Sequence, residues 1–305
     1  MFKKIFHFLI AYFAYWYYGR PSRQLIVIGV TGTKGKSITC RFITSVLEAG
    51  GFSVGLLSTV DIQVAGRRVL NQYKMTMLGR GKIQKLLGQM VKAGCQYAVI
   101  ETSSEGILQY RHIGLNYDIA VFTNLGTEHS ERHGGFDQLR ADKGKLFKAL
   151  KKKKYIDGKL IPKILIANGD DKNAYYFLNF TADQKWICGL SDQISGQLTV
   201  KAGDIQLGNE RTVFEAGSVF VLNMIGKFNI YNALIAIAVG RSQQIEDKKI
   251  KIGLESVKKI EGRMEFIDQG QSFKVIVDYA HEPMSYTELF TTLRDLFITS
   301  SRLIA

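Results

Sequence analysis

The sequence contains few prolines and few cysteines, and both shortages restrict what the protein can be. Its 305 residues include 3 Pro, so no long proline-rich linker is available. The 3 cysteines, Cys40, Cys95 and Cys188, are widely spaced, which excludes a C-x-x-C zinc pattern and a dense disulfide framework. We expect a protein of the reducing cytoplasm in which these cysteines are small core residues.

A long apolar segment that could cross a membrane is also missing. Within the aromatic stretch 2–18, the uncharged part, residues 5–18, has 14 residues, fewer than the roughly 17 to 25 that a transmembrane helix needs. No small-residue cleavage site follows, which argues against a signal peptide. The tyrosines and the tryptophan suit a membrane interface, and packing on the next domain is an equally supported alternative.

The overall composition is that of a folded protein with a basic surface. Hydrophobic residues make up 46% and charged residues 22%, so disorder is not expected. The net charge of +14 favours nucleotides, phosphorylated sugars, nucleic acid or an anionic membrane as partners, without choosing among them. The densest basic run, residues 151–154, is predicted to be a solvated loop. It lacks the interleaved aromatics of single-strand binding, so no nucleic-acid partner is expected.

The most informative pattern is an apolar strand, a glycine-rich turn and a helix. Residues 25–30 lead into Thr31-Gly-Thr-Lys-Gly-Lys-Ser37, and a helical pattern runs on to Ala49. This order predicts a phosphate-binding loop, in which Lys36 reaches terminal phosphates and the Ser37 hydroxyl binds Mg²⁺. The spacing is unusual, because Val30 stands where the common pattern has its first glycine. The alternative, a chance surface turn, is disfavoured by the flanking strand and helix.

From residue 25 onward, short apolar runs alternate with helical patterns. Runs such as 98–100 and 119–122 suggest strands buried on both faces, which predicts a doubly wound α/β domain with a mostly parallel sheet. A small antiparallel excursion is expected after Leu190. A charged segment at 246–251, a strand at 273–277 and a helix near 285–297 follow. The other expected strands are 25–30, 53–58, 97–102, 119–123, 163–167 and 185–188, and the expected helices are 37–49, 81–93, 135–150 and 229–239.

Polar residues follow two of the predicted buried strands. Glu101 ends the strand 97–102, and His129 follows the strand 119–123. If both strands neighbour the first strand, these residues converge beside Lys36 and Ser37 and can complete the ligand shell of Mg²⁺ held by phosphates. The alternative for Glu101 is an ordinary surface carboxylate. His129 taken alone favours neither a metal ligand nor an ordinary surface histidine.

Seven blocks in the order of the chain resemble the Mur ligases, and within them the branch that adds the third residue of the peptidoglycan stem peptide. The blocks cover about residues 25 to 285. They are Thr31-Gly-Thr-Lys-Gly-Lys-Ser37, Glu101-Thr-Ser-Ser104, Thr123-Asn-Leu-Gly-Thr-Glu-His129, Asp142-Lys-Gly-Lys-Leu-Phe147, Gly226-Lys-Phe-Asn-Ile-Tyr-Asn-Ala233, Gly262-Arg-Met-Glu265 and Asp278-Tyr-Ala-His281.

The resemblance implies an activity in the cytoplasm. Mur ligases activate a substrate carboxylate with ATP as an acyl phosphate, which an incoming amine attacks. The implied partners are a UDP-N-acetylmuramoyl-peptide and an amino acid, and the implied cofactors are ATP and Mg²⁺. The implied fold is a P-loop central domain at 25–258, preceded by the aromatic segment 1–24 and followed at 259–305 by the start of a Rossmann-like C-terminal domain.

The resemblance also assigns residues. It implies Lys36, Lys143 and His129 as catalytic residues and Ser37, Glu101, His129 and Lys143 around the metal, with Lys143 N-carbamylated. Without it, Lys143 would be one more cation on a basic helix. ATP is assigned to Gly32, Thr33, Lys34, Gly35, Lys36 and Ser37, with Asn229 and Asn232 at the adenine, Arg263 at the phosphates and Asp278 at the ribose. Asn229 could also cap the helix it opens. The muramoyl peptide is assigned to Thr76, Ser103, Gln109 and Arg111.

The sequence departs from the family in three places. The family's paired threonines read Thr76-Met77, so one hydroxyl contact is lost. Only 24 residues precede Leu25, too few for the family's UDP-binding domain. The nucleotide is therefore gripped differently, or the acceptor is not an ordinary UDP-sugar peptide; a membrane-attached or lipid-linked acceptor is a third option. The third domain is cut off at Ala305, so the choice of amino acid is unreadable, and we expect a truncated or split coding region or a partner that supplies the rest.

Two rival functions stay open. A folylpolyglutamate synthase-like ligase shares the loop and the lysine, although Gln109, Arg111 and the Asp278 block favour the muramoyl branch. A nucleotide-binding scaffold without ligase activity is the rival from a different class. The oligomeric state cannot be derived from the sequence.

Overall fold

A nine-stranded sheet forms the centre of the molecule, which is described here by a computed structural model covering residues 2–73, 75–127, 130–196, 198–281 and 283–297. The strand order is β11-β10-β9-β6-β1-β5-β2-β3-β4. The strands from β11 to β2 pair in parallel, and the β3–β4 hairpin adds antiparallel pairs at one edge. The bounds are β1 Ile26–Thr31, β2 Val54–Leu57, β3 Asp61–Val64, β4 Arg67–Leu70, β5 Tyr97–Glu101, β6 Ile119–Phe122, β9 Ile164–Asn168, β10 Gln184–Gly189 and β11 Thr199–Lys201.

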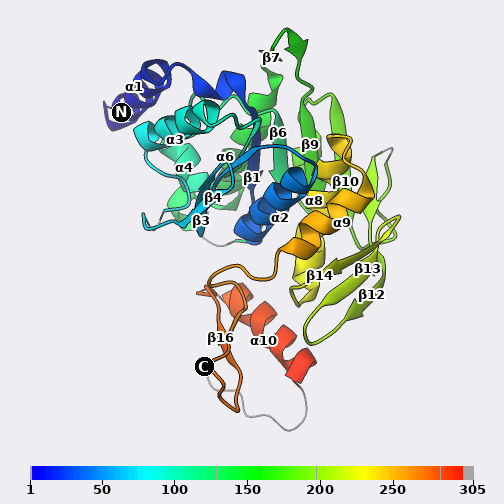
Figure 1. Ribbon diagram of the computed structural model, residues 1–305. Helices are drawn as coiled ribbons and strands as arrows, with labels where there is room; N and C mark the ends of the chain where they lie inside the picture. Colours follow the sequence, from blue (N-terminus) through cyan, green and yellow to red (C-terminus); the bar gives the residue numbers. More distant parts are fainter. Residues whose placement is uncertain (1, 74, 128–129, 197, 282, 298–305) are drawn as a thin grey trace.

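Helices cover both faces of this sheet (Figure 1). One face packs against α2 (Lys36–Ala49), α8 (Lys227–Ser242) and α9 (Asp247–Ser256), and the other against α3 (Arg80–Lys92), α6 (Phe136–Lys148) and α7 (Ala174–Leu178). Alternate strand residues belong to the two cores, with Val99 in the first and Ala98 and Ile100 in the second. This confirms the prediction of a doubly wound α/β domain with a mostly parallel sheet.

The segment after the sheet's last strand is antiparallel, as expected. β12 (Gly203–Leu207), β13 (Thr212–Glu215) and β14 (Val219–Leu222) form a three-stranded meander. The described C-terminal part contains β15 (Glu265–Ile267) paired with β16 (Val275–Val277), and then α10 (Pro283–Phe297). Figure 1 shows this part below the central sheet. The remaining elements are η1 (Pro21–Gln24), α4 (Ser104–Leu108), α5 (Ser130–His133), η2 (Ala149–Lys151), β7 (Tyr155–Ile156) and β8 (Lys159–Leu160).

The N-terminal segment is a helix, α1 (Phe2–Tyr17), which packs along α3. Ala11, Ala14 and Tyr15 are buried, and the Tyr15 hydroxyl accepts a hydrogen bond from the side-chain amide of Asn116 at 3.0 Å. A Cβ on Gly114 would lie 2.6 Å from the Tyr15 ring, so this glycine allows the close approach. The segment therefore packs on the next domain along one of its faces. No described helix is long and apolar enough to span a membrane.

One helix in a charged segment was not predicted from the sequence, and the prediction of a solvated basic run holds for residues 151–153 but not for Lys154. The charged segment 246–251 is the start of helix α9, because Ile250 and Leu254, four residues apart, are buried on one face of it. In the basic run 151–154, the last lysine is not solvated. Lys154 is buried and forms an ion pair with Asp118. The prediction that the three cysteines are core residues is confirmed, since all are buried and free.

Candidate functional site

The glycine-rich turn joins β1 to α2 at the carboxyl end of the sheet's central strand. Gly35, with φ +77°, is the N-cap of α2. A Cβ at Gly35 would collide with Oδ1 of Asn232, and one at Gly32 would collide with Oγ1 of Thr123. Both positions therefore require glycine. The turn ends at a helix N-terminus, which presents backbone amides and positive potential to an anion.

Residues after β6 hold this loop in shape. Asn124 accepts from the backbone amide of Thr33 through its carbonyl (2.9 Å) and from that of Lys34 through its side chain (2.8 Å). Thr123 Oγ1 donates to the Lys34 carbonyl at 2.7 Å. The amides of Thr33 and Lys34 are thus used inside the protein. Sequence reasoning assigned both residues to ATP and gave Asn124 no role, although Asn124 lies in one of the quoted blocks.

Ser37 and Glu101 lie in direct contact beside the loop. β5 runs parallel to β1 with Glu101 opposite Val30, which brings the end of β5 to the start of α2. The Ser37 hydroxyl donates to Glu101 Oε2 at 2.9 Å, and the Thr59 amide donates to the same oxygen at 2.8 Å. Both side chains are buried. Hydroxyl and carboxylate oxygens are suitable ligands for Mg²⁺.

The described residues contain no other dense set of metal ligands near this pair. No group of three or more His, Cys, Asp or Glu side chains that could hold a metal is found in the described part of the chain. A cation at Ser37 and Glu101 would therefore need further oxygens from a bound phosphate, which is how Mg²⁺ is commonly held in nucleotide sites. His129, which the sequence also placed here, lies outside the described residues.

Lys143 approaches the loop from the opposite face of the sheet. It lies on α6, is buried, and its ammonium donates to the Gly32 carbonyl at 3.0 Å. The preceding residue, Asp142, is fully buried and contacts His133 at 2.8 Å. Burial favours a higher pKa for the Asp142 carboxyl, but hydrogen bonds from Lys145 and His133 outweigh it and lower the pKa. The His133–Asp142 pair, which joins α5 to the middle of α6, was not found from the sequence.

Asn229 and Asn232 connect α8 to the loop. Asn232 accepts a hydrogen bond from the Thr39 hydroxyl at 3.0 Å and donates to Asn229 at 3.3 Å. The capping role predicted for Asn229 is wrong, because α8 begins at Lys227 with Gly226 as its N-cap, and the Asn229 side chain donates to the Ile225 carbonyl instead.

The C-terminal part reaches the loop through Arg263. Its guanidinium lies 3.5 Å from the Ser37 hydroxyl and 4.8 Å from the centre of the Tyr279 ring. Asp278 uses its carboxylate on nearby backbone amides, those of Met264 (2.8 Å) and Ala280 (2.7 Å). Asp278 therefore shapes the segment that carries Arg263.

The predicted substrate residues line two adjoining segments. Arg111 donates to the Met77 carbonyl and, at 2.6 Å, to Gln109 Oε1. Ser103 caps α4 by accepting from the Gly106 amide at 3.1 Å.

Thr76 and Met77 hold positions close to the Glu101 carboxylate. Thr76 accepts from the hydroxyl of Thr59, the residue whose amide binds Glu101. Met77 is buried against Gly106, where its thioether fills the space that a Cβ would occupy. The methionine at the second threonine position thus serves packing.

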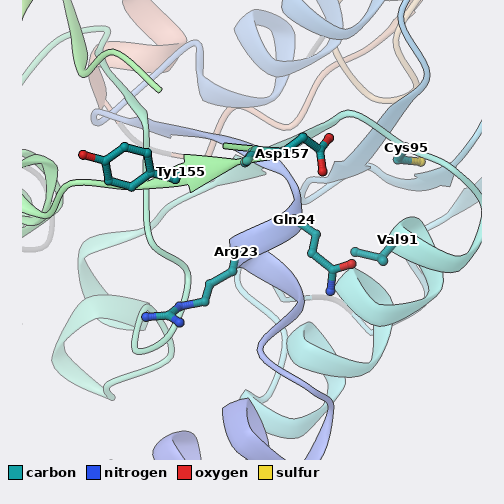
Figure 2. A pocket seen from close by; sticks show the side chains of 7 residues that line it. Arg23, Gln24, Val91, Cys95, Tyr155 and Asp157 are labelled. Carbon is teal, nitrogen blue, oxygen red and sulfur yellow. The ribbon is translucent and has the colours of Figure 1, made fainter. Parts of the chain in front are cut away.

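A depression lies at the amino ends of the parallel strands, opposite to the end that carries the phosphate loop. It has a volume of about 290 Å³ and is bordered by Arg23 of η1, Val91 of α3, Cys95, and Tyr155 and Asp157 of the β7–β8 turn (Figure 2). These residues lie near the amino ends of β1 and β5, whereas open α/β sheets bind ligands at the carboxyl ends. The depression is therefore separate from the phosphate loop.

A glycine-rich loop, a helix N-terminus and neighbouring hydroxyl and carboxylate oxygens at the carboxyl edge of a parallel sheet are the features of the phosphate-loop class of α/β proteins. A family model described as the Mur ligase middle domain matches residues 30–240. The chain belongs to the Mur ligase family, which confirms the resemblance of its seven sequence blocks.

Curated relatives agree with this assignment. The chain is 36% identical over 304 residues to a UDP-N-acetylmuramyl-tripeptide synthetase of Roseiflexus sp. (strain RS-1), covering 95% of this chain and 58% of the relative. It is 35% identical over 286 residues to a UDP-N-acetylmuramoyl-L-alanyl-D-glutamate–2,6-diaminopimelate ligase of Geobacillus kaustophilus, covering 92% and 56%. The chain thus spans just over half the length of the relatives it matches.

Solved structures share the fold. A UDP-N-acetylmuramoyl-L-alanyl-D-glutamate–2,6-diaminopimelate ligase superposes with a TM-score of 0.70 at 23% identity, covering 89% of this chain and 54% of that one. The folylpolyglutamate synthase of Mycobacterium tuberculosis in complex with ADP and AMPPCP gives 0.75 at 16% identity, covering 97% and 75%. At these identities the likeness concerns the fold alone.

Proposed function

We propose that this chain binds ATP and Mg²⁺ and takes part in ligating an amino acid to a UDP-N-acetylmuramoyl-peptide during peptidoglycan precursor synthesis. The observation that carries the proposal is the contact of Ser37 with Glu101 at 2.9 Å, with Arg263 at 3.5 Å from the same hydroxyl. Three distant segments thus place a hydroxyl, a carboxylate and a guanidinium at one helix N-terminus. These are the groups needed to hold Mg²⁺ and a transferring phosphoryl group.

The proposed reaction has two steps. The acceptor's carboxylate oxygen attacks the γ-phosphorus of ATP, ADP leaves, and an acyl phosphate forms. The amine of the amino acid then attacks the acyl carbon, the C–O bond to phosphate breaks, and an amide remains after the amine loses a proton. Lys36, Arg263 and the amides at the start of α2 would stabilise the charge on the phosphoryl group. Gly32, Thr33, Lys34 and Gly35 would form the loop that follows the phosphates.

The proposed metal ligands are Ser37 and Glu101, with His129 assigned by the family resemblance. Bound Mg²⁺ would neutralise charge on the phosphate oxygens. We propose that Lys143 is N-carbamylated: its amine adds CO₂ and loses a proton, which replaces an ammonium by a carboxylate. Its burial and its distance of 3.0 Å to the Gly32 carbonyl support a role at the loop.

The nucleoside and the acceptor are assigned to the neighbouring residues. Asn229 and Asn232 would bind the adenine region, supported by the bond of Asn232 to Thr39 in the second turn of α2. Asp278 would bind the ribose. The acceptor would contact four residues, which lie around the Arg111 side chain or close to the Glu101 carboxylate. They are Thr76, Ser103, Gln109 and Arg111.

Domain limits and location belong to the same proposal. We infer a segment 1–24, an ATP-binding unit 25–258 and the start of a further ligase domain at 259–305. We place the chemistry in the cytoplasm, where UDP-linked precursors are made, and residues 2–18 at the inner membrane surface. The membrane contact rests on α1 alone and does not depend on the chemistry of the loop.

The ligase proposal is tested by measuring phosphate release from ATP with UDP-N-acetylmuramoyl-dipeptide and candidate amino acids. Turnover that requires both substrates, and that is lost in Lys36→Ala but kept in the exposed-lysine control Lys148→Ala, is the expected result. ATP binding without turnover would favour the scaffold function. Turnover with a reduced folate and glutamate would favour a folylpolyglutamate synthase-like ligase. Equal ATP affinity of Lys36→Ala and the unmodified chain would refute the phosphate-loop assignment.

Carbamylation has its own readout. In ¹³C-bicarbonate, the unmodified chain should show a carbamate carbonyl resonance that disappears in Lys143→Ala and persists in Lys148→Ala. Persistence of the resonance in Lys143→Ala would assign it to another lysine and contradict the proposal.

A further inference from the structure

Helix α1 exposes most of its large apolar side chains and buries two alanines and one tyrosine. The face packed on the protein carries Ala11, Ala14 and Tyr15, which are 1%, 7% and 8% exposed. The opposite face is solvent-accessible and almost entirely apolar or aromatic: Phe6, Leu9, Ile10, Tyr12, Phe13, Trp16 and Tyr17. An amphipathic helix of a globular protein has the reverse arrangement, with its largest apolar residues in the core. This second apolar face, the outer face of α1, therefore needs another partner.

The charge around the outer face distinguishes between partners. No Asp or Glu occurs before Glu48, whereas Lys3 and Lys4 begin the helix sequence and Arg20 and Arg23 follow its end. The Arg20 guanidinium lies 4.4 Å from the centre of the Trp16 ring. Two copies packed through α1 would bring only cations together at the helix ends. An anionic lipid surface would instead neutralise them.

The residue types and the length of α1 also favour a lipid surface as the partner. Tyrosine and tryptophan are enriched at the level of lipid headgroups, and three tyrosines and the tryptophan lie within α1. The 16 residues of α1 correspond to about 24 Å, too short to cross a bilayer of about 30 Å but sufficient to lie in its surface. Figure 1 shows α1 at the periphery of the molecule beside α3, with its ribbon open to the outside.

We propose that the outer face of α1 docks on an anionic membrane surface, with the helix in the interface plane. The docking also positions the predicted acceptor residues. The ring of Phe8 meets the ring of Tyr110 edge-on at 6.0 Å, and Tyr110 directly precedes Arg111. Helix α1 thus contacts the segment that carries the predicted acceptor residue Arg111. This inference goes beyond the ligase proposal and stands without it.

Vesicle flotation tests the docking with the full chain and no nucleotide or substrate, so its failure would leave the ligase proposal intact. Vesicles of phosphatidylcholine that contain the anionic lipid phosphatidylglycerol are compared with vesicles of phosphatidylcholine alone. The chain should float with the anionic vesicles. Leu9→Ser/Phe13→Ser/Trp16→Ser should bind at least ~tenfold more weakly.

A matched control replaces three large side chains of similar fractional exposure elsewhere. Tyr175, Val219 and Ile252 are 64%, 55% and 55% exposed, against 55%, 69% and 50% for Leu9, Phe13 and Trp16. The control Tyr175→Ser/Val219→Ser/Ile252→Ser should bind vesicles within about twofold of the unmodified chain, because its residues lie outside α1. Equal loss in the two triple variants would overturn the proposal, as would absence of binding to both vesicle types.

Trp16 supplies a second measurement that does not depend on a destabilising change in α1. The chain has 2 tryptophans, and Trp186 is 9% exposed. In Trp186→Phe the emission of Trp16 should shift to shorter wavelength on adding anionic vesicles and be quenched by lipids brominated near the headgroup. An unchanged spectrum, together with a concentration-dependent dimer that the α1 triple variant abolishes, would show that a second copy covers this face and would overturn membrane docking.

Discussion

The Ser37 hydroxyl donates a 2.9 Å hydrogen bond to Glu101 although the two residues are 64 positions apart in the sequence. The parallel register of β1 and β5 makes the contact, because it sets Glu101 level with Val30 at the sheet's carboxyl edge.

Replacement of Glu101 by glutamine keeps an acceptor for the Thr59 amide and removes the charge. In Glu101→Gln we expect weaker Mg²⁺ binding, so that the Mg²⁺ concentration at half-maximal ATP turnover rises ~100-fold. Mg²⁺ titration of phosphate release measures it, with the exposed Glu105→Gln as control; an unchanged Mg²⁺ midpoint would remove Glu101 from the metal site.

Gly35 is predicted to be irreplaceable for both backbone and packing reasons. Its φ of +77° is unfavourable for other residues, and a Cβ would collide with Asn232. Gly35→Ala should destabilise the fold by about 1–3 kcal/mol and weaken ATP binding. Gly88, in the interior of α3 with open space around its Cα, is the matched control, and Gly88→Ala should stabilise by about 0.5–1 kcal/mol. Urea unfolding measures both, and equal effects at the two positions would contradict the argument.

Asp61 should make stability depend on pH in the acid range. It is buried and paired with Arg41 and Arg68. Burial favours a higher pKa for this carboxyl, but the two guanidinium groups and the Ser58 hydroxyl outweigh it and lower the pKa below its ordinary 3.8. Its contribution is therefore complete above pH 3.8 and is lost as the pH falls toward the folded pKa.

Asp61→Asn tests this dependence. At pH 7 it should cost about 3 kcal/mol of unfolding free energy, because two guanidinium groups lose their charged partner. The difference from the unmodified chain should shrink as the pH falls below 3.8. Asp137→Asn, which alters an exposed pair with Arg140, should change stability by less than about 0.5 kcal/mol. Urea unfolding between pH 7 and 3 gives the curves, and a constant difference between them would disprove the linkage.

Arg111 should affect the acceptor more than ATP. Its guanidinium bridges the Met77 carbonyl and Gln109, which a lysine ammonium cannot reproduce with the same planar geometry. Arg111→Lys should raise KM for the UDP-N-acetylmuramoyl-peptide ~tenfold or more and leave KM for ATP within about twofold. The exposed Arg132→Lys serves as control. A parallel rise in both KM values would show a general structural effect instead.

The sequence was sufficient for the features encoded in short, local patterns. The strand, glycine turn and helix around Lys36 were predictable because the apolar run, the glycine-rich turn and the helical pattern follow one another directly in the sequence. That β5 and β6 both neighbour β1 was only a condition of the sequence argument, and the strand pairing in the structure meets it. Asn124 was not assigned a role, since its bonds to Thr33 and Lys34 depend on how β6 is set beside β1.

Charged residues were the main source of error. Lys154 was taken for a solvated lysine because its neighbours in the run are, and only the fold reveals Asp118, 36 residues earlier, as its partner. Burial lowers the pKa of Lys154, and the Asp118 carboxylate opposes that effect. In α9 the charged residues concealed the two apolar positions, four apart, that determine the helix.

The bond between Tyr15 and Asn116, described with the fold, joins α1 to the α/β unit that carries the phosphate loop. A membrane that holds the outer face of α1 would consequently hold the phosphate loop at a fixed height and tilt. Encounters with an acceptor attached to the same membrane, the third option named for this chain, would then occur in two dimensions, unlike encounters with the UDP-linked acceptor proposed above. The turnover rate would follow the number of acceptors per unit area of lipid, and dilution of the vesicles at constant composition would leave it unchanged.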